Sequence, residues 1–177
     1  LFVIKNNRIT DTLLLPPGLS NSNRANGRFI GVTANSIKGF ISNSWFLIEK
    51  ESNTVQILGE FEGDIKHIDE TSGRFITTSE FIYDLSPKNK KYTNLKLNLH
   101  GTFSVQSELY GFSDDGLFLL EIIDNELSAK PLILNEFNKH SLRITQDSVY
   151  IGSVNGLWSF SKKHMPQPFK NSNTTLL

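Results

Sequence analysis

One short segment constrains the fold of this chain most, because it occurs twice. Residues 148–161 read Ser-Val-Tyr-Ile-Gly-Ser-Val-Asn-Gly-Leu-Trp-Ser-Phe-Ser, which is typical of a strand, a tight Asn-Gly turn and a second strand. Residues 108–121 read Glu-Leu-Tyr-Gly-Phe-Ser-Asp-Asp-Gly-Leu-Phe-Leu-Leu-Glu. The matched positions are Tyr110 with Tyr150, Ser113 with Ser153, Gly116 with Gly156, Leu117 with Leu157, and Phe118 with Trp158. A repeated two-strand segment predicts a fold built from copies of one unit.

Weaker copies of this segment lie upstream. Phe40 falls on Phe75 when the chain is shifted by 35 positions, and Phe75 falls on Tyr110 after the same shift. Each copy combines an aromatic residue, a Ser or Thr, a polar turn and an apolar run around a second aromatic residue. These central aromatic residues are Phe46, Phe81, Phe118 and Trp158. The approximate repeats are residues 27–60, 64–98, 101–135 and 140–170, after a partial copy at residues 1–19.

Each repeat is predicted to hold four short strands. In the second repeat the expected strands are residues 64–69, 74–78, 81–85 and 92–97. In the third repeat they are residues 102–106, 108–112, 117–123 and 127–134. In the fourth repeat they are residues 142–145, 148–152, 157–160 and a weaker strand at 165–169. The first full repeat covers about residues 28–59. Gly, Asn, Ser and Pro cluster between the expected strands, as in strand connections. No useful stretch has a helical apolar period, so the sequence predicts an all-β fold.

Tandem four-stranded units of about 35–45 residues indicate β-propeller blades. A blade needs neighbours on both faces, so its central strands should be apolar on both sides, as residues 117–120 are. We expect the central aromatic residues to pack between blades, each stabilising the fold by roughly 2–3 kcal/mol. A β-sandwich or barrel is the alternative. The shared register of an aromatic residue and a Ser or Thr favours a β-propeller-type array of four-stranded antiparallel blades.

The count of units predicts a single propeller fragment over residues 1–177, with about four and a half blades. Residues 1–5 and 8–15 are expected to be the last two strands of a preceding unit. Closed propellers have roughly 4–8 blades, and an unpaired half blade would leave an open sheet edge. We therefore expect a longer parent chain to supply the remainder of the propeller.

The composition excludes several classes of protein. Of the 177 residues, 38% are hydrophobic and 20% are charged, which is typical of a globular domain. Eighteen basic and eighteen acidic side chains cancel, so nucleic acid is not a favoured partner. The lack of cysteine excludes disulfides and thiolate metal sites. No apolar run approaches the roughly 20 residues that span a bilayer, so we expect no membrane segment in the sequence shown.

The segment Tyr150-Ile-Gly-Ser-Val-Asn-Gly-Leu-Trp-Ser-Phe160 resembles the repeat of the two-component regulator propellers. Those repeats typically run aromatic-Ile-Gly-Thr, two or three polar residues, Gly-Leu, an aromatic and a hydrophobic residue. Residues 110–120 carry Gly-Phe in place of Ile-Gly, and residues 75–83 and 40–48 lack Gly-Leu. The resemblance implies the extracytoplasmic, periplasmic sensor region of a bacterial membrane-anchored regulator. Such regions usually have seven-bladed propellers, followed by an immunoglobulin-like domain, a membrane helix and signalling domains.

The turns between the repeated strands supply weak candidates for ligand contact. Asp114 and Asp115 lie in the turn of the third repeat, Asn155 in that of the fourth and Asn43 in that of the first. Asp-Gly and Asn-Gly also favour hairpin turns in their own right, and a calcium loop would need further oxygen ligands at set spacing. Trp45 is the best candidate for stacking on a sugar or peptide, since later copies carry Glu80, Gly116 and Gly156 there. It could also fill a gap between blades.

The remaining titratable residues give no clear chemical site. His100 and His140 share one repeat position, where a metal or proton-relay role is conceivable, but solvated loop histidines are the simpler interpretation. No metal-binding spacing accompanies them, and we expect no metal and no cofactor. Glu60, Glu62 and Asp64 could serve glycoside hydrolysis, although alternating carboxylates in a loop are usually solvated.

Three hypotheses follow from the sequence. The preferred one is a non-catalytic sensor module that binds a small molecule, a glycan or a protein through the turns on one face of the propeller. A propeller enzyme that hydrolyses or cleaves polysaccharide is the second, although no acidic residue recurs at inward positions. A protein-binding scaffold is the third, although the Gly-His and Trp-Asp signature of such repeats is missing.

Overall fold

The structure is a computed structural model that describes residues 2–5, 8–12, 27–52, 54–69, 71–86, 90–93, 96–123 and 126–168. Every regular element in these residues is a β-strand, and all strands pair in antiparallel sheets. Four sheets of three or four strands follow one another along the chain, so the predicted all-β, propeller-type array is confirmed. The described residues include no helix long and apolar enough to cross a membrane. The chain divides into two compact units, Leu1–Ile65 and Lys66–Leu177, which are described separately.

The first unit holds a two-stranded and a four-stranded sheet. The strands are β1 (Phe2–Lys5), β2 (Arg8–Thr12), β3 (Gly27–Val32), β4 (Ser36–Ile41), β5 (Ser44–Glu49) and β6 (Thr54–Glu60). The order β3-β4-β5-β6 is the predicted four-stranded first repeat. Phe46 and Ile48 of β5 are buried with Ile37 and Val55 around them. Leu47, between them on the other face, is only half-buried, so burial on β5 alternates.

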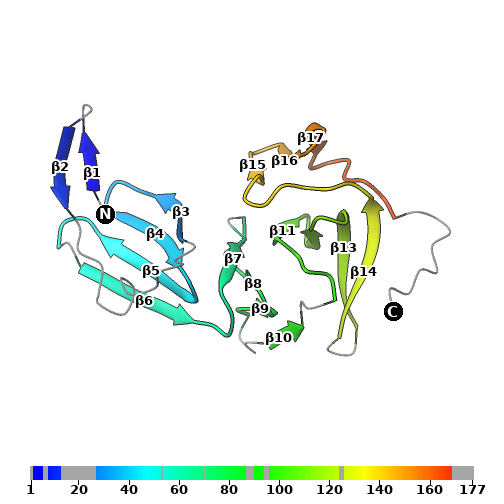
Figure 1. The fold of residues 1–177 in the computed structure, drawn as a ribbon, viewed down its shortest axis with the longest axis horizontal. Coiled ribbons are helices and arrows are strands. Elements are labelled where there is room, and N and C mark those ends of the chain that lie inside the picture. Colours follow the sequence, from blue (N-terminus) through cyan, green and yellow to red (C-terminus); the bar gives the residue numbers. More distant parts are fainter. Residues whose placement is uncertain are drawn as a thin grey trace. The chain divides into compact units, whose positions relative to one another are not determined.

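The second unit contains three sheets, each corresponding to one predicted repeat. Its strands are β7 (Ile65–Ile68), β8 (Phe75–Thr78), β9 (Phe81–Asp84) and β10 (Lys90–Thr93), then β11 (Gly101–Val105), β12 (Glu108–Phe112), β13 (Leu117–Ile123) and β14 (Glu126–Ile133), then β15 (Arg143–Ile144), β16 (Ser148–Ser153) and β17 (Gly156–Ser161). Figure 1 shows the first strands, β7, β11 and β15, closer to one another than the last strands, β10, β14 and β17.

The middle sheet of the second unit is covered on both faces. Leu117 and Tyr110 lie on the face that packs against the β15–β17 sheet, in a cluster with Phe137 and Ile151. Phe118 and its neighbours on the other face belong to a second cluster with Phe75 and Ile82 of the β7–β10 sheet. Apolar residues on both sides of β13 therefore join three consecutive blades, as the apolar run predicts.

Of the four central aromatic residues, Phe118 packs between blades as expected, whereas Phe46 is buried among residues of its own sheet. Phe46 and Phe118 are buried, with 3% and 2% of their surface exposed. The prediction for Trp158 is wrong, because 36% of this side chain is exposed. Trp158 lies on β17, the edge strand of a three-stranded sheet, so within the described residues no fourth strand shields it. It still packs edge-on against Phe137 and stacks on Phe160.

The second repeat places a different aromatic residue at the central position. Phe118 pairs with Gly111, and the residue in the corresponding pairing is Tyr83, opposite Ile76. Phe81 instead begins β9, where it is half-buried and Lys91 Nζ lies 4.5 Å from the centre of its ring. The two-residue turn between β8 and β9 fixes this register, which the spacing of aromatic residues does not reveal.

Two predicted strands are also wrong. Residues 92–97 are not one strand, because β10 pairs with β9 over Lys90–Thr93 and Leu97 packs into an apolar cluster instead. Residues 165–168 form no strand either. Met165 is buried in the core beside the β15–β17 sheet, and Pro166 lacks the backbone donor that a strand ladder uses. In both places an apolar residue packs into a core cluster without belonging to a strand.

An ion pair links the two inner strands of the β7–β10 sheet, β8 and β9. Arg74 donates from Nε and Nη2 to the two carboxylate oxygens of Asp84, at 2.7 Å each. The Asp84 side chain is 4% exposed, and its hydrogen bond with Arg74 lowers the pKa of this carboxyl. The pair stabilises the fold above the unfolded aspartate pKa of about 4, and this stabilisation is lost as the pH falls below that value.

We therefore expect Asp84→Asn to lower the free energy of unfolding at neutral pH by about 1–3 kcal/mol. The variant should also lose less stability than the wild type between about pH 5 and pH 3, because its amide does not titrate. Urea denaturation at a series of pH values measures both effects. Parallel pH profiles for the two proteins would contradict the assignment.

Candidate ligand-binding site

The Ser or Thr shared by the repeats caps the turn in the middle of each blade of the second unit. In the second unit, Thr78 Oγ1 accepts a hydrogen bond from Phe81 N at 2.9 Å, and Ser113 Oγ accepts one from Asp115 N at 3.0 Å. Ser153 Oγ likewise accepts one from Asn155 N at 3.2 Å. Because these side chains satisfy donors of their own turns, the repeated Ser or Thr is a structural element rather than a ligand contact.

The candidate residues of the first unit contribute to their own sheet. Asn43 is exposed in the β4–β5 turn, and its Nδ2 donates to Phe61 O at 3.3 Å. Trp45 pairs with Phe40, as Leu117 does with Phe112, so it occupies a sheet position and not the turn position that the sequence spacing predicts. Its indole Nε1 is buried and has no acceptor among the described residues.

Asp114 is the candidate residue that the structure places in a charged cluster. It lies in the β12–β13 turn with 53% of its side chain exposed, and its Oδ1 is 2.7 Å from His100 Nε2. The hydrogen bond with His100 lowers the pKa of Asp114, and the charges of Lys139 and Lys66 lower it further. Asp115, in the same turn as Asp114, and Asn155, in the β16–β17 turn, are both exposed.

Lys66 contributes a half-buried ammonium group to the cluster. It lies on β7, where its Nζ donates to Asn98 Oδ1 at 3.0 Å and to Leu99 O at 3.3 Å. Burial lowers the pKa of Lys66, and the positive charge of Lys139 lowers it further. Charged groups held near each other with perturbed pKa values are typical of functional sites.

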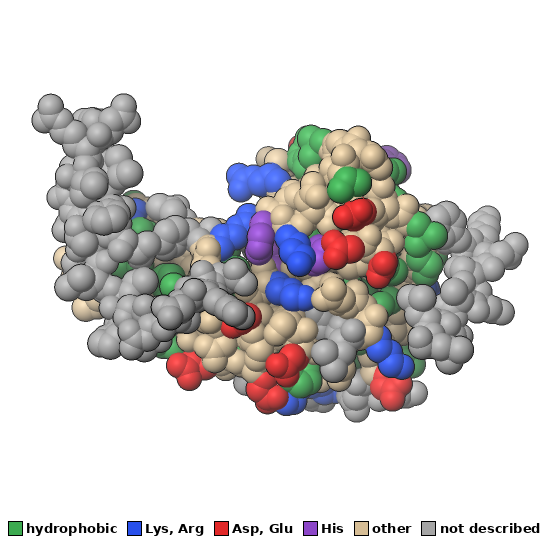
Figure 2. All heavy atoms as spheres, in the orientation of Figure 1, with side chains coloured by type: hydrophobic (Ala, Val, Ile, Leu, Met, Phe, Trp, Pro, Cys, Tyr) green, Lys and Arg blue, Asp and Glu red, His purple; other side chains and the backbone are tan. Residues whose placement is uncertain are grey.

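The cluster draws on three blades of the second unit. Lys66 comes from β7, His100 from the residue before β11, Asp114 from the β12–β13 turn and Lys139 from the segment before β15. Figure 2 shows lysine or arginine and histidine side chains gathered over β7 and β11, with acidic side chains beside them. We call these four residues the axial cluster, since three of them lie on or just before first strands and Asp114 lies within hydrogen-bond distance of one of these three, His100.

His100 is not the solvated loop residue that the sequence suggested. Its side chain is fully buried, its ring meets Phe112 edge-on at 6.1 Å, and its Nδ1 has no partner among the described residues. His67 is buried beside the same phenylalanine, at 6.4 Å between ring centres. Gly101 makes room for it, because a Cβ there would lie 2.8 Å from His67 Cγ. His140, in contrast, is exposed as expected.

The three loop carboxylates considered for glycoside hydrolysis are solvated, which was the simpler interpretation of the sequence. Glu60, Glu62 and Asp64 are exposed, and Asp64 accepts a hydrogen bond from Ser42 Oγ at 3.0 Å. No group of three or more His, Asp or Glu side chains in the described residues is arranged to hold a metal ion.

Comparisons with protein-family models, curated proteins and solved structures find no match to this chain. Its function must therefore be argued from its own geometry. The axial cluster is the arrangement that sequence reasoning missed in part, since Lys66 and Lys139 lie in unrelated positions of different repeats. The one signal was the shared position of His100 and His140, which marks the segment before each first strand.

Proposed function

We propose that this chain is a non-catalytic ligand-binding module built on propeller blades, and that the axial cluster is its ligand site. The observation that carries the proposal is the convergence of Lys66, His100, Asp114 and Lys139 from three consecutive blades. Two ammonium groups, one of them half-buried, offer charge-assisted hydrogen bonds to a carboxylate on a ligand. The only carboxylate of the cluster is already engaged by His100. A small molecule with an acidic group, such as an acidic sugar, matches this arrangement.

Binding of glucuronate tests the proposed site, with glucose as the neutral control that has a similar ring. We expect glucuronate to bind more tightly than glucose, and Lys66→Ala to weaken glucuronate binding by about tenfold, since charge-assisted hydrogen bonds contribute about 1.5–3 kcal/mol. Isothermal titration calorimetry measures both affinities. Lys163→Ala is the matched control, because Lys163 is exposed beyond the opposite end of β17. Equal affinities for the two sugars, or an unchanged affinity in Lys66→Ala, would count against the site.

We also propose that the module is the extracytoplasmic sensor region of a bacterial signal-transduction regulator. The support is the likeness of residues 150–160 to the two-component regulator propeller repeat, together with the propeller-type blades. The flanking gene sequence tests this role: a membrane helix and signalling domains downstream are expected. A gene that ends within a few further blades after a signal peptide would refute it. Release of reducing sugar from a polysaccharide would instead favour a propeller enzyme.

A further inference from the structure

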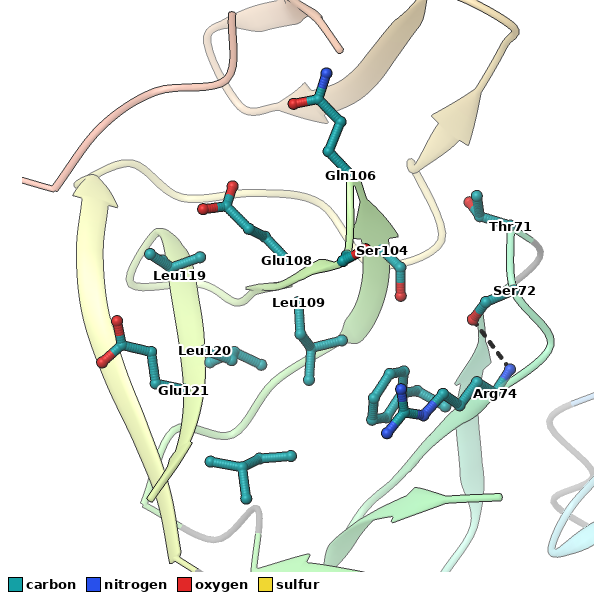
Figure 3. A pocket seen from close by; sticks show the side chains of 13 residues that line it. Thr71, Ser72, Arg74, Ser104, Gln106, Glu108, Leu109, Leu119, Leu120 and Glu121 are labelled. Atoms are coloured by element: carbon teal, nitrogen blue, oxygen red, sulfur yellow. Dashed lines mark hydrogen bonds between the residues drawn. The ribbon is translucent and has the colours of Figure 1, made fainter. Parts of the chain in front are cut away.

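The second unit has a cavity at the opposite end of its strands from the axial cluster. Asp114 of the axial cluster lies in the turn after β12, whereas this cavity is lined by the turns that precede β8 and β12. Its volume is about 610 Å³. Figure 3 shows the β7–β8 turn with Thr71 and Ser72 on one side and Glu108, Leu109 and Leu119 on the other. Polar side chains from two blades thus surround a partly aliphatic surface.

A buried carboxylate holds the two polar walls of the cavity together. Asp69, which is fully buried, accepts hydrogen bonds from Ser72 Oγ at 2.6 Å and from Ser104 Oγ at 2.7 Å. It also accepts one from Thr71 N at 2.9 Å. Ser72 belongs to one blade and Ser104 to the next, so the relative position of these walls is fixed before any ligand binds. Such preorganisation lowers the entropy cost of binding.

The turn between β11 and β12 has two non-glycine residues in a backbone conformation that favours glycine. Gln106 and Ser107 have φ angles of 51° and 71°, in the left-handed region, and both line the cavity. Two-residue hairpin turns with two positive φ angles usually carry Asn-Gly. Non-glycine residues in this region cost roughly 1–2 kcal/mol each, and such strain clusters at ligand-binding sites. The presence of Gln106 and Ser107 instead of glycine at the rim of the cavity therefore lowers the stability of the fold.

Three charged side chains line the cavity, and among the described residues only one of them, Glu108, has no oppositely charged partner. Arg74 is paired with Asp84, and Glu121 lies 2.7 Å from Lys130 Nζ. Glu108 accepts a hydrogen bond from the Tyr110 hydroxyl, and in the described residues it makes no ion pair. Burial raises the pKa of Tyr110, and the bond with Glu108 raises it further, so the phenol keeps its proton and donates it to this hydrogen bond. The local balance of charge is thus negative.

We propose that this cavity is a second ligand site, selective for a small polar molecule that carries an ammonium group, and that Glu108 is its anchor. The hydroxyl of Ser107 and the amide of Gln106 offer hydrogen bonds to ligand hydroxyls, and Leu109 and Leu120, which pair on one face of the sheet, contact its carbon skeleton. An amino sugar or an amino alcohol has this chemistry. The site differs from the axial cluster in position and in the sign of the charge that it selects.

Glucosamine and glucose test the proposal, because they differ only in the amine. In an NMR titration of the full chain, we expect glucosamine to shift the backbone amides of residues 106–109 and to bind at least about tenfold more tightly than glucose. Glu108→Gln should reduce glucosamine affinity to the level of glucose. Glu80→Gln is the matched control, since this exposed glutamate lies in the β8–β9 turn of the neighbouring blade and does not line the cavity, and it should leave both affinities unchanged.

Three outcomes would overturn the second site. These are equal affinities for the two sugars, no binding of glucosamine at millimolar concentration, and full glucosamine binding in Glu108→Gln. Glu108 is an exposed residue, so its amide variant is expected to fold, and the melting temperature of the variant verifies this. Failure here leaves the glucuronate experiment at the axial cluster unaffected, because the two tests use different ligands and different residues.

Discussion

Replacing Leu117 with Ala is expected to destabilise the chain by about 2–5 kcal/mol, whereas Leu157→Ala should cost less than about 0.5 kcal/mol. The two leucines follow the same glycine in the same repeat motif, and each lies at the start of the third strand of its blade. Leu117 is fully buried and packs in the core shared with the next blade. Leu157 is 69% exposed, so its truncation creates no cavity.

Urea denaturation of the wild type and both variants measures this difference directly, since the substitution is chemically identical. Circular dichroism in the far ultraviolet follows loss of the sheets, and the midpoint shift at constant slope gives the change in stability. Comparable destabilisation by both substitutions would mean that Leu157 is buried in solution, for example against another copy of the chain. Dilution of the protein would then weaken the effect at Leu157.

Gly116→Ala is the second substitution with a large expected effect, at least about 3 kcal/mol. A Cβ at this position would lie 2.2 Å from the carbonyl oxygen of Ile133, which is backbone and cannot rotate away. Ile133 is paired with Leu117, so a shift of this strand would break the β13–β14 ladder. The φ angle of 156° adds strain for any residue with a side chain.

Gly156 provides the matched control for Gly116. It stands at the same position of the next repeat with a φ angle of 131°, and a Cβ there would have nothing within 4 Å. We expect Gly156→Ala to cost only the backbone strain, about 1–3 kcal/mol. The difference in melting temperature between the two variants isolates the steric contact with Ile133. Equal melting temperatures would show that the two strands do not approach so closely.

Local chemistry explains why much of the fold was predictable. The strands over 108–112 and 117–123 were predicted with the bounds of β12 and β13, because short apolar runs between Gly, Asp and Ser leave little freedom. Strand predictions failed where an apolar residue is buried outside a sheet. Leu97 and Met165 are apolar because they fill the core between sheets, and periodicity cannot distinguish such residues from strand residues.

The axial cluster was predictable only in part, because its residues are far apart along the chain. Asp114 was a candidate because its turn stands out locally. Lys66 and Lys139 approach Asp114 only when consecutive blades pack, so no local pattern marks them. His100 was assigned to solvent, yet it is fully buried, since the segment before β11 passes between neighbouring blades.

The sequence by itself determined the repeat, the all-β fold and the turn chemistry, because glycine geometry, turn caps and apolar runs act over a few residues. Tertiary structure decided which copies of the same motif are buried. Leu117 and Leu157 have nearly the same neighbours in sequence, but one is covered by another sheet and the other is not. Tertiary structure also brought together the charges of the axial cluster and of the Glu108 cavity. Burial and electrostatic interactions depend on distances in space, and these are set by the stacking of blades.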